Sequence, residues 1–216
     1  MTIKAALDGR IGAKNKATIV KAAERAFAKH GFKGTSVQQI ADAAGLPKTN
    51  VLYYFKSKQG LYLAVLQQIM AIWNLSFDKA TANDDPAETL AEYISEKMEV
   101  SRTRPYASKV FAMEIINGAT NFQGSFLEEH REWMNGRTAV IDAWVAQGKM
   151  PPIDAHYLLY HIWASTQHYA DFSTQISNLR GSTMKKADYK IATLNLVNMI
   201  LQGCGLQVPK EYQLLK

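Results

Sequence analysis

The sequence predicts an all-helical protein, and three observations lead to this fold class. Apolar residues recur at the spacings of three and four that one face of a helix requires, along most of the 216 residues. The alternation of apolar and polar residues typical of half-buried strands is nearly absent. Glycine and proline separate the periodic segments, as they do at helix ends. The apolar content of 47% is enough to build a sizeable core.

Two helices are predicted at the front of the chain. The first covers about residues 14–30 and stops at Gly31, because glycine readily adopts the left-handed conformation found at helix C-termini. Thr35 stands three residues before Gln38, the spacing at which a hydroxyl and an amide cap each other's backbone N–H groups. A second helix is therefore expected from Thr35 to Gly45.

The third predicted helix is short and follows almost at once. Pro47 fits a first helical turn, where its missing N–H would have no partner in any case, so this helix is expected over 47–55. Residues 56–58 interrupt the pattern, and a long fourth helix follows through Trp73 to about Ala80. Further helices are predicted over residues 86–102, 105–117, 122–148, 154–177 and 186–203.

The positive charge of the chain is concentrated at its front. Residues 1–58 hold eleven Lys or Arg against three Asp or Glu, net +8, whereas the remainder is net −2. A solvated basic face would explain this, but a basic segment is also the electrostatic signature of nucleic-acid binding. We predict a flexible basic arm over 1–13, which either touches DNA or is only solvated, a head over 14–58 and a helical body over 59–216.

Two helices joined by the tight turn AGLP have the proportions of a helix-turn-helix. Val51 and Phe55, four residues apart, can pack against the first two helices. The remaining residues of this helix are then available for the major groove of double-stranded DNA or its edges: Lys48, Thr49, Asn50, Tyr53 and Tyr54. The alternative is that the tyrosines are packing residues and that the lysines only solvate the surface.

Two further residues of the head are predicted to bind DNA phosphates. Lys58 lies near the start of the fourth helix, and Thr35 lies at the start of the second. The free N–H groups and the positive end of the helix dipole favour an anion at both places.

The segment GFKGTSVQQIADAAGLPKTNVLYYFKSKQGLYLAVL resembles the DNA-binding domain of the TetR family of transcriptional regulators, and the resemblance covers residues 14–66. It implies a three-helix DNA-binding head on a helical ligand-binding and dimerisation body. It also implies a homodimer that represses transcription from an inverted-repeat operator until a small molecule releases it. Pro47 replaces a common Ser or Thr cap and Thr49 replaces a common glycine, so base preference cannot be transferred from the family.

Nearly the whole chain resembles one branch of this family, the pyrimidine-responsive regulators of pyrimidine catabolism. The resemblance lies in four segments: KTNVLYYF (48–55), MEVSR (98–102), PYASKVFAMEI (105–115) and IWASTQHYADF (162–172). It implies uracil or thymine as the effector.

The residues of the helix predicted over 154–177 suit such a ligand. Trp163 and Gln167 lie one turn apart on one face. The edge of a pyrimidinedione alternates carbonyl and N–H groups, so a Gln amide offers the matching donor and acceptor, and an indole offers a stacking surface. The resemblance implies that Trp73 forms a second wall of this pocket. Aromatic residues at helical spacing are also typical of an ordinary core.

The last helix offers a predicted dimer surface, although an intrachain core explains the same stripe equally well. Its members are Ile191, Leu194, Asn198 and Leu201. The fourth helix begins near Lys58 and reaches Trp73, so it would touch both the DNA-binding head and the pocket. A ligand that tilts this helix would change the spacing of the two heads on DNA.

Other functions fit the sequence less well. A different effector, apolar or cationic, would make the protein a repressor of an efflux or stress gene. An enzyme would have to use His156, His161, His168, Asp171 and Glu114, whose spacing matches no established metal or catalytic motif. We therefore expect no enzymatic activity, no cofactor and no metal.

The compartment is expected to be the cytoplasm. The N-terminus lacks the apolar segment of a secretory signal, and no apolar run reaches the roughly 18 residues that a membrane span requires. The single cysteine, Cys204, lies in an apolar pattern and is expected to be a buried, reduced thiol.

Overall fold

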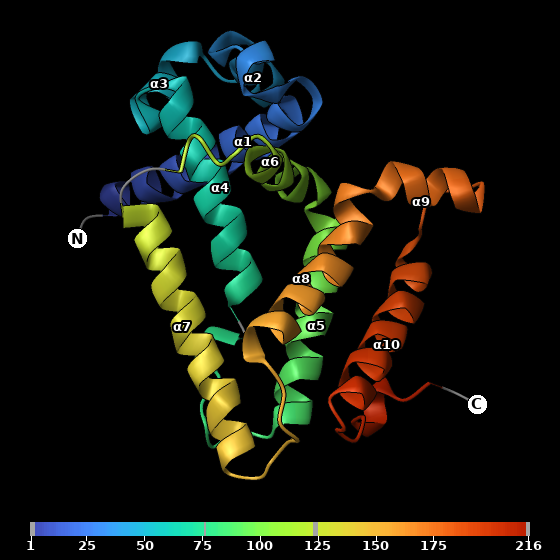
Figure 1. Cartoon of the computed structure of the whole chain (residues 1–216). Coiled ribbons are helices and arrows are strands. Elements are labelled where there is room, and N and C mark those ends of the chain that lie inside the picture. The colour runs from blue at the N-terminus through green and yellow to red at the C-terminus, as the bar shows by residue number, and fades with distance from the viewer. Residues whose placement is uncertain (1–2, 76, 123–124, 215–216) are drawn as a thin grey trace. The chain divides into compact units, whose positions relative to one another are not determined.

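The computed structural model describes residues 3–75, 77–122 and 125–214, and every regular element in these ranges is a helix (Figure 1). The predicted all-α fold class is confirmed. The helices are α1 (Ile3–Gly34), α2 (Val37–Ala44), α3 (Lys48–Phe55), α4 (Lys58–Asn74), the 3-10 helix η1 (Phe77–Lys79), α5 (Pro86–Thr103), α6 (Pro105–Ile116), α7 (Ser125–Ala146), α8 (Ala155–Asp171), α9 (Ser173–Arg180), α10 (Lys186–Gly203) and the 3-10 helix η2 (Lys210–Tyr212).

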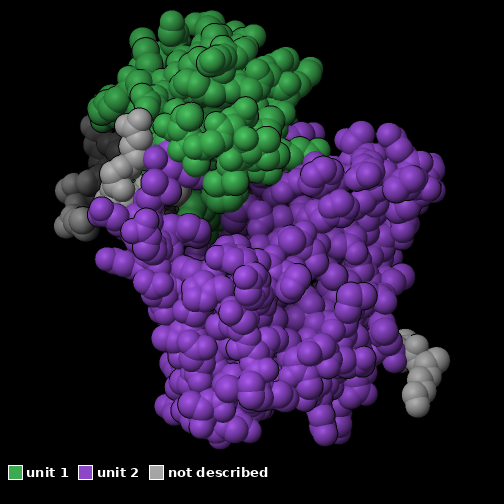
Figure 2. Space-filling model, viewed as in Figure 1, with its two compact units in different colours: residues 1–70, 109–121 green, residues 71–108, 122–216 purple. Residues whose placement is uncertain are grey.

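The chain divides into two compact units (Figure 2). Unit 1 comprises residues 1–70 and 109–121, and unit 2 comprises residues 71–108 and 122–216. Helices α1, α2 and α3 belong to unit 1, whereas α5, α7, α8, α9 and α10 belong to unit 2. Helices α4 and α6 each contribute residues to both units.

Helix α1 is longer than predicted. It begins at Ile3 instead of about Lys14, because residues 3–13 are rich in alanine and other good helix formers and contain no proline. Gly31, the predicted end, does leave helical geometry, with φ 68° and ψ 175°. The chain resumes a helical turn after this kink and ends the element at Gly34.

The core of unit 1 follows the predicted periodicity of α1. Ile19, Ala23 and Phe27 lie at spacings of four and are fully buried. They meet α2, which packs against α1 and buries Ile40 completely. Val51 of α3 is also buried, as predicted.

The predicted cap of α2 is wrong by one residue. Ser36, and not Thr35, is the N-cap: its Oγ accepts a hydrogen bond from the backbone N–H of Gln39 at 3.2 Å. The side chain of Gln39 accepts in return from the Ser36 N–H at 2.8 Å, so the reciprocal cap is formed by these two residues. The helix ends at Gly45, which adopts the left-handed conformation with φ 64°, as predicted.

Unit 2 is built around α5, whose start is fixed by its own sequence. Asp85 accepts hydrogen bonds from the N–H groups of Ala87 at 2.9 Å and Glu88 at 3.0 Å, and Pro86 occupies the first helical position. Helix α5 packs against both α8 and α10. This arrangement makes α5 the element to which most of the unit 2 core is attached.

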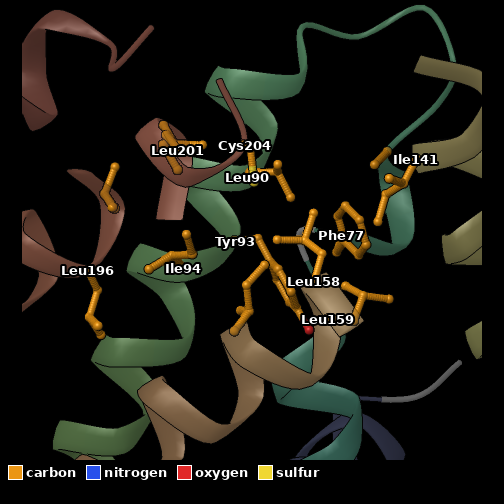
Figure 3. Close-up of a cluster of buried hydrophobic side chains, with 14 of the residues drawn as sticks. Phe77, Leu90, Tyr93, Ile94, Ile141, Leu158, Leu159, Leu196, Leu201 and Cys204 are labelled. Carbon is orange, nitrogen blue, oxygen red and sulfur yellow. The ribbon is translucent and has the colours of Figure 1, made fainter. Parts of the chain in front are cut away.

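The buried cluster of unit 2 joins these three helices (Figure 3). Each fully buried leucine or isoleucine in it contributes about 1.5–3 kcal/mol relative to an exposed position. The cluster includes Leu90, Tyr93, Ile94, Leu158, Leu159, Ile162, Leu196 and Leu201. Cys204 is buried in the same cluster, and burial raises the pKa of its thiol, as befits a packing residue.

Two predicted helices of the body end differently. Helix α4 stops at Asn74, a residue of low helix propensity, and not at about Ala80, and η1 is a separate turn. The helix predicted over 154–177 is two helices, α8 and α9, which are separated at Phe172 with φ −106° and ψ 24°. None of the described helices is long and apolar enough to cross a membrane.

Candidate functional site

Helix α3 presents a polar surface on one side of unit 1. Lys48 and Thr49 at its start are exposed, Asn50 is half-buried, and Tyr53 is 72% exposed. The opposite side carries Val51, which is 1% exposed and packs inward. The helix therefore separates packing residues from the residues predicted to face DNA.

Each of the two tyrosines of α3 lies beside a lysine. The rings of Tyr53 and Tyr54 meet edge to face, with 5.2 Å between their centroids. The Nζ of Lys16 lies 5.7 Å from the centroid of Tyr54, and the Nζ of Lys56 lies 5.6 Å from that of Tyr53. Both contacts are within the range of a cation–π interaction. Tyr54 is half-buried, so the packing alternative describes Tyr54 better than the exposed Tyr53.

Lys58 at the start of α4 is bound to the end of α1. Its Nζ donates to the backbone carbonyl of Phe32 at 2.9 Å and to that of Thr35 at 3.0 Å, and it lies 4.5 Å from the centroid of the Phe32 ring. An ammonium has three N–H donors, so these two bonds leave one for a further acceptor such as a phosphate. The side chain thus fixes the turn between α1 and α2.

Thr35 is an interior residue of unit 1. It is 2% exposed, and its hydroxyl donates to the carbonyl oxygens of Gly31 at 2.8 Å and Ala26 at 3.2 Å. The neighbouring Ser36, which the sequence prediction passed over, is exposed at the N-terminus of α2. Its signal was present, since Ser36 and Gln39 have the same spacing as Thr35 and Gln38.

The start of α4 lies against the end of α3. Gly60 occupies a position where a Cβ would collide with the backbone carbonyl oxygen of Phe55. Lys56 between the two helices adopts φ 63°, a left-handed conformation that is uncommon outside glycine. The direction of α3 is therefore fixed by α4 as well as by α1 and α2.

A second group of candidate residues lies inside unit 2. Trp73, near the end of α4, is 5% exposed, and the Nζ of Lys97 on α5 lies 4.6 Å from the centroid of its ring system. The same ammonium lies 5.8 Å from the centroid of Tyr93. Lys97 is 2% exposed. Burial lowers the pKa of Lys97 to about 7, and the negative charge of Asp171 opposes this change.

Tyr93 connects this lysine to α8. The Nε1 of Trp163 donates a hydrogen bond to the Tyr93 hydroxyl at 2.8 Å. Burial raises the pKa of Tyr93 far above its ordinary value, and the bond from Trp163 opposes the change only in part. Trp73 and Trp163, the two predicted walls, are therefore joined through Lys97 and Tyr93 of α5.

The aromatic character of this region extends to α7. Trp163 lies 6.1 Å from Trp133 and 6.2 Å from His130, measured between ring centroids, and His130 stacks on Trp133 at an angle of 4°. The Nδ1 of His130 is buried without a hydrogen-bond partner among the residues that the structure describes. Burial lowers the pKa of this imidazole, which favours its neutral form.

Gln167 lies one turn after Trp163 on α8 and is half-buried. Within the described part of the chain, its side-chain amide makes no hydrogen bond. Asp171, one turn further, accepts a hydrogen bond from the Ser108 hydroxyl at 2.6 Å. The predicted pair Trp163 and Gln167 is thus brought together on one helix.

Tyr93 and Lys97 were missed by the sequence prediction, although a signal for Lys97 existed. Leu90, Ile94 and Lys97 lie at spacings of four and three on the apolar stripe of α5, so the lysine occupies a core position. Charged residues are rarely buried without a partner, so the stripe alone does not point to a buried lysine.

The residues considered for an enzyme do not form one site. Glu114 is buried in unit 1, where it accepts hydrogen bonds from the Tyr62 hydroxyl at 3.0 Å and from the Asn121 backbone at 2.7 Å. The histidines at positions 156, 161 and 168 are exposed on α8. No group of three or more His, Cys, Asp or Glu in the described ranges is arranged to hold a metal ion.

A helix-turn-helix with a basic, polar second helix, joined to a helical body, defines a DNA-binding transcriptional regulator. Residues 19–65 match the family described as bacterial regulatory proteins, tetR family, and residues 66–207 match the family described as YcdC-like protein, C-terminal region. The chain belongs to the TetR family of transcriptional regulators. These are DNA-binding proteins and not enzymes.

Curated relatives agree with this assignment. The chain is 41% identical to the HTH-type transcriptional regulator RutR of Escherichia coli (strain K12) over 194 residues, which is 89% of this chain and 91% of that protein. It is 34% identical to the HTH-type transcriptional repressor NicS of Pseudomonas putida over 83 residues, 38% of this chain and 39% of that protein.

Solved structures share the fold. The crystal structure of AibR in complex with isovaleryl coenzyme A and operator DNA matches with a TM-score of 0.61 and 16% identity, covering 86% of this chain and 97% of that chain. A TetR family regulator from Marinobacter aquaeolei VT8 matches with a TM-score of 0.62 and 20% identity, covering 88% and 97%. At these identities the likeness concerns the fold alone.

Proposed function

We propose that the protein is a repressor of pyrimidine catabolism that binds an inverted-repeat operator as a homodimer and is released by uracil or thymine. The single observation that carries the effector assignment is the pair Trp163 and Gln167 on one face of α8. The indole is half-buried beside a half-buried amide that makes no hydrogen bond to the described residues. A flat ring with alternating carbonyl and N–H groups fits both side chains.

The proposed pocket includes Trp73 as its second aromatic wall. This indole is buried in unit 2 and contacts Lys97. The similarity of the segments around Trp163 and Gln167 to pyrimidine-responsive members of the family supports the same assignment. Uracil and thymine share the imide edge, so both are candidates.

The proposed DNA surface is the exposed side of α3 with its neighbours. Lys48, Thr49, Asn50 and Tyr53 would contact the major groove or its edges, and Tyr54 a phosphate near Lys16. Lys58 would give its third N–H to a phosphate, while Thr35 would act through the carbonyl that it offers to Lys58. The exposed N-cap Ser36 adds a hydroxyl at the N-terminus of α2.

The division of labour follows the predicted domains, with residues 14–58 for DNA and 59–216 for ligand and dimerisation. Residues 3–13, predicted as part of a flexible basic arm but helical as the first part of α1, would supply further positive charge beside the operator. A repressor of this kind acts in the cytoplasm, where bacterial DNA lies.

The proposed dimer face lies on α8, α9 and α10. The predicted stripe on α10 needs revision, because Leu201 is fully buried and Asn198 is 8% exposed, which places both in the core of the chain. Ile191 of the predicted stripe is exposed, and so are further large apolar side chains on or between these three helices: Tyr157, Tyr160, Phe172, Leu179 and Met199. Exposed large apolar side chains that form one continuous surface are typical of a subunit interface, and we propose that these residues do so.

Helix α4 would couple the two functions. It begins at Lys58 and contains Trp73 fifteen residues later, which is about 22 Å at 1.5 Å per residue. If the effector favours a tilted α4, the two α3 helices of the dimer no longer match half-sites spaced by turns of the DNA helix. By linkage, uracil and DNA must weaken each other by the same factor, typically 1–3 kcal/mol.

Titration of a fluorescent DNA fragment from upstream of the gene tests this proposal. We expect uracil to reduce DNA binding by the wild-type protein and to have no effect on Gln167→Ala, whose DNA binding without ligand is unchanged. Gln147→Ala, at an exposed position after α7, serves as the control for loss of a glutamine. If Gln167→Ala bound DNA more weakly than the wild type even without uracil, the proposed separation of the two sites would be contradicted.

A further inference from the structure

Lys97 occupies a position that is unfavourable for a cation. It lies on the apolar stripe of α5 and is 2% exposed. Among the residues whose side chains the structure describes, no other lysine or arginine is buried. Removing an ammonium from water costs several kcal/mol, so a methionine of similar length at this position would make the folded protein more stable. Groups kept at such a cost are enriched at functional sites.

The surroundings of Lys97 leave its hydrogen-bonding capacity unused. The faces of Trp73 and Tyr93 attract the positive charge but offer no oxygen to its N–H groups. Asp171 contributes its negative charge, while one of its carboxylate oxygens accepts from the Ser108 hydroxyl. No hydrogen bond joins the Lys97 Nζ to a residue of the described ranges. An oxygen acceptor from outside the chain would complete its coordination.

The position of Lys97 connects it to the residues of the proposed pocket. Its ammonium contacts the ring of Trp73, and its other aromatic neighbour, Tyr93, is hydrogen-bonded to Trp163. Gln167 follows Trp163 one turn later. A ligand held between the two indoles therefore lies within reach of a buried positive charge.

We propose that Lys97 determines which ligands the effector site accepts: its ammonium donates a hydrogen bond to a ring carbonyl oxygen and excludes ligands that carry a positive charge. This inference rests on the proposed function of the same site. A pyrimidinedione has two carbonyl groups, so one can pair with Gln167 and the other with Lys97. In cytosine an amino group replaces one carbonyl, and a donor would then face the donors of the ammonium.

Calorimetry with the full-length wild-type protein tests the selectivity. We expect uracil to bind at least tenfold more tightly than 4-thiouracil, whose sulfur is a poor acceptor, and more tightly than cytosine. An organic cation such as tetraethylammonium should not bind. Equal affinity for uracil, 4-thiouracil and cytosine would overturn the inference without affecting the proposal that the site takes a pyrimidine.

The variant Lys97→Met provides a second test of the inference. We expect it to bind uracil about 10–100-fold more weakly, the usual effect of losing a charge-assisted hydrogen bond, and to bind operator DNA like the wild type. Lys79→Met, at an exposed position in η1 of the same unit, is the matched control and should bind uracil normally. Unchanged uracil affinity in Lys97→Met would also overturn the inference.

Thermal unfolding without ligand separates the two proposals. Because Lys97→Met removes a buried charge, we expect its Tm to rise. If the wild type binds no pyrimidine at all, the proposed effector is wrong, and the Tm decides on Lys97. A higher Tm shows that the buried ammonium destabilises the folded protein, as the inference requires, whereas a lower Tm would show that Lys97 is structural and would overturn the inference.

Discussion

Unit 1 carries exposed lysines on and beside α3, whereas unit 2 buries a lysine in its core. The side chains of Lys48 and Lys56 lie on the surface of α3 and its C-terminus, where water solvates them, while Lys97 lies in the core between two aromatic rings. An exposed charge costs little and acts on a polyanion through a field that salt screens. A buried charge is costly and is screened little, so it can discriminate between small ligands.

On the proposed function, this difference corresponds to two kinds of partner, a polyanion bound by unit 1 and a small electron-rich ring bound by unit 2. DNA is long and uniformly charged, so several loosely placed cations suffice to bind it. A small ring offers one or two oxygen atoms, so the cation that recognises it must be held in place by its neighbours. Substitutions in the two units test this contrast, and the largest effect is expected at Lys97.

The pH dependence of stability tests the burial of Lys97. Its pKa in the folded protein is about 7, below its value of about 10.5 in the unfolded chain, so the unfolded state binds more protons between these values. The wild type should therefore gain stability as pH rises from 7 to 10.5. At pH 7, the free energy of unfolding of Lys97→Met should be about 1–4 kcal/mol higher than that of the wild type, and this difference should be smaller at pH 10.

Urea denaturation at pH 7 and pH 10 measures the difference in unfolding free energy between Lys97→Met and the wild type at each pH. The groups that face the Lys97 ammonium are Trp73, Tyr93 and Asp171, and all three are retained in the variant, so their own titration largely cancels in the difference. Lys79→Met should show no such pH-dependent gap. A constant difference between wild type and Lys97→Met would mean that the ammonium is not buried in solution.

The variant Lys58→Ala has two expected effects of intermediate size. Loss of the bonds from Nζ to the carbonyl oxygens of Phe32 and Thr35 should cost about 1–3 kcal/mol of unfolding free energy. DNA binding should weaken for all sequences, and its slope against log salt should fall by about one unit.

Lys48→Ala is the matched comparison for Lys58→Ala. Lys48 is exposed, so its loss should affect DNA binding while leaving the free energy of unfolding within about 0.5 kcal/mol of the wild type. An unchanged salt slope in Lys58→Ala would remove this residue from the phosphate contacts. Unchanged stability would contradict its role at the end of α1.

The smallest effect is expected for Ser36→Ala. This change removes the acceptor for the Gln39 N–H at the start of α2 and should lower the free energy of unfolding by about 1 kcal/mol. Ser36→Asn keeps a capping side chain and should restore most of the loss. Thermal denaturation followed by circular dichroism measures both, and equal Tm values for Ser36→Ala and the wild type would argue against the cap.

The sequence predicted the head well where local rules act alone. Gly45 ends α2 because glycine readily adopts the left-handed conformation, and Pro47 precedes α3 because its ring fixes φ and removes an N–H; both effects hold in any context. The cap of α2 could not be located, since Thr35 and Ser36 are both followed three residues later by a glutamine. The carbonyl groups of Ala26 and Gly31 decide between them, and only the folded chain brings these to Thr35.

The body was harder to predict because its features depend on packing between distant segments. No glycine or proline marks the break between α8 and α9 at Phe172. Leu201 and Ile191 follow the same helical period, yet one is fully buried and the other is 60% exposed. Trp163 and Gln167 could be predicted because they lie on one helix. Lys97 could not, because its role depends on contacts with Trp73 and Tyr93 that only the folded chain shows.

The exposed start of α3 also bears on how readily such a regulator changes its target. Within the described chain, the side chains of Lys48 and Thr49 make no hydrogen bond or ring contact, so replacing them disturbs no neighbour. If these two residues contact bases as proposed, new base preferences can be selected at them without compensating changes elsewhere. A lineage of duplicated genes could diverge in the promoters it recognises while the rest of the molecule stays the same.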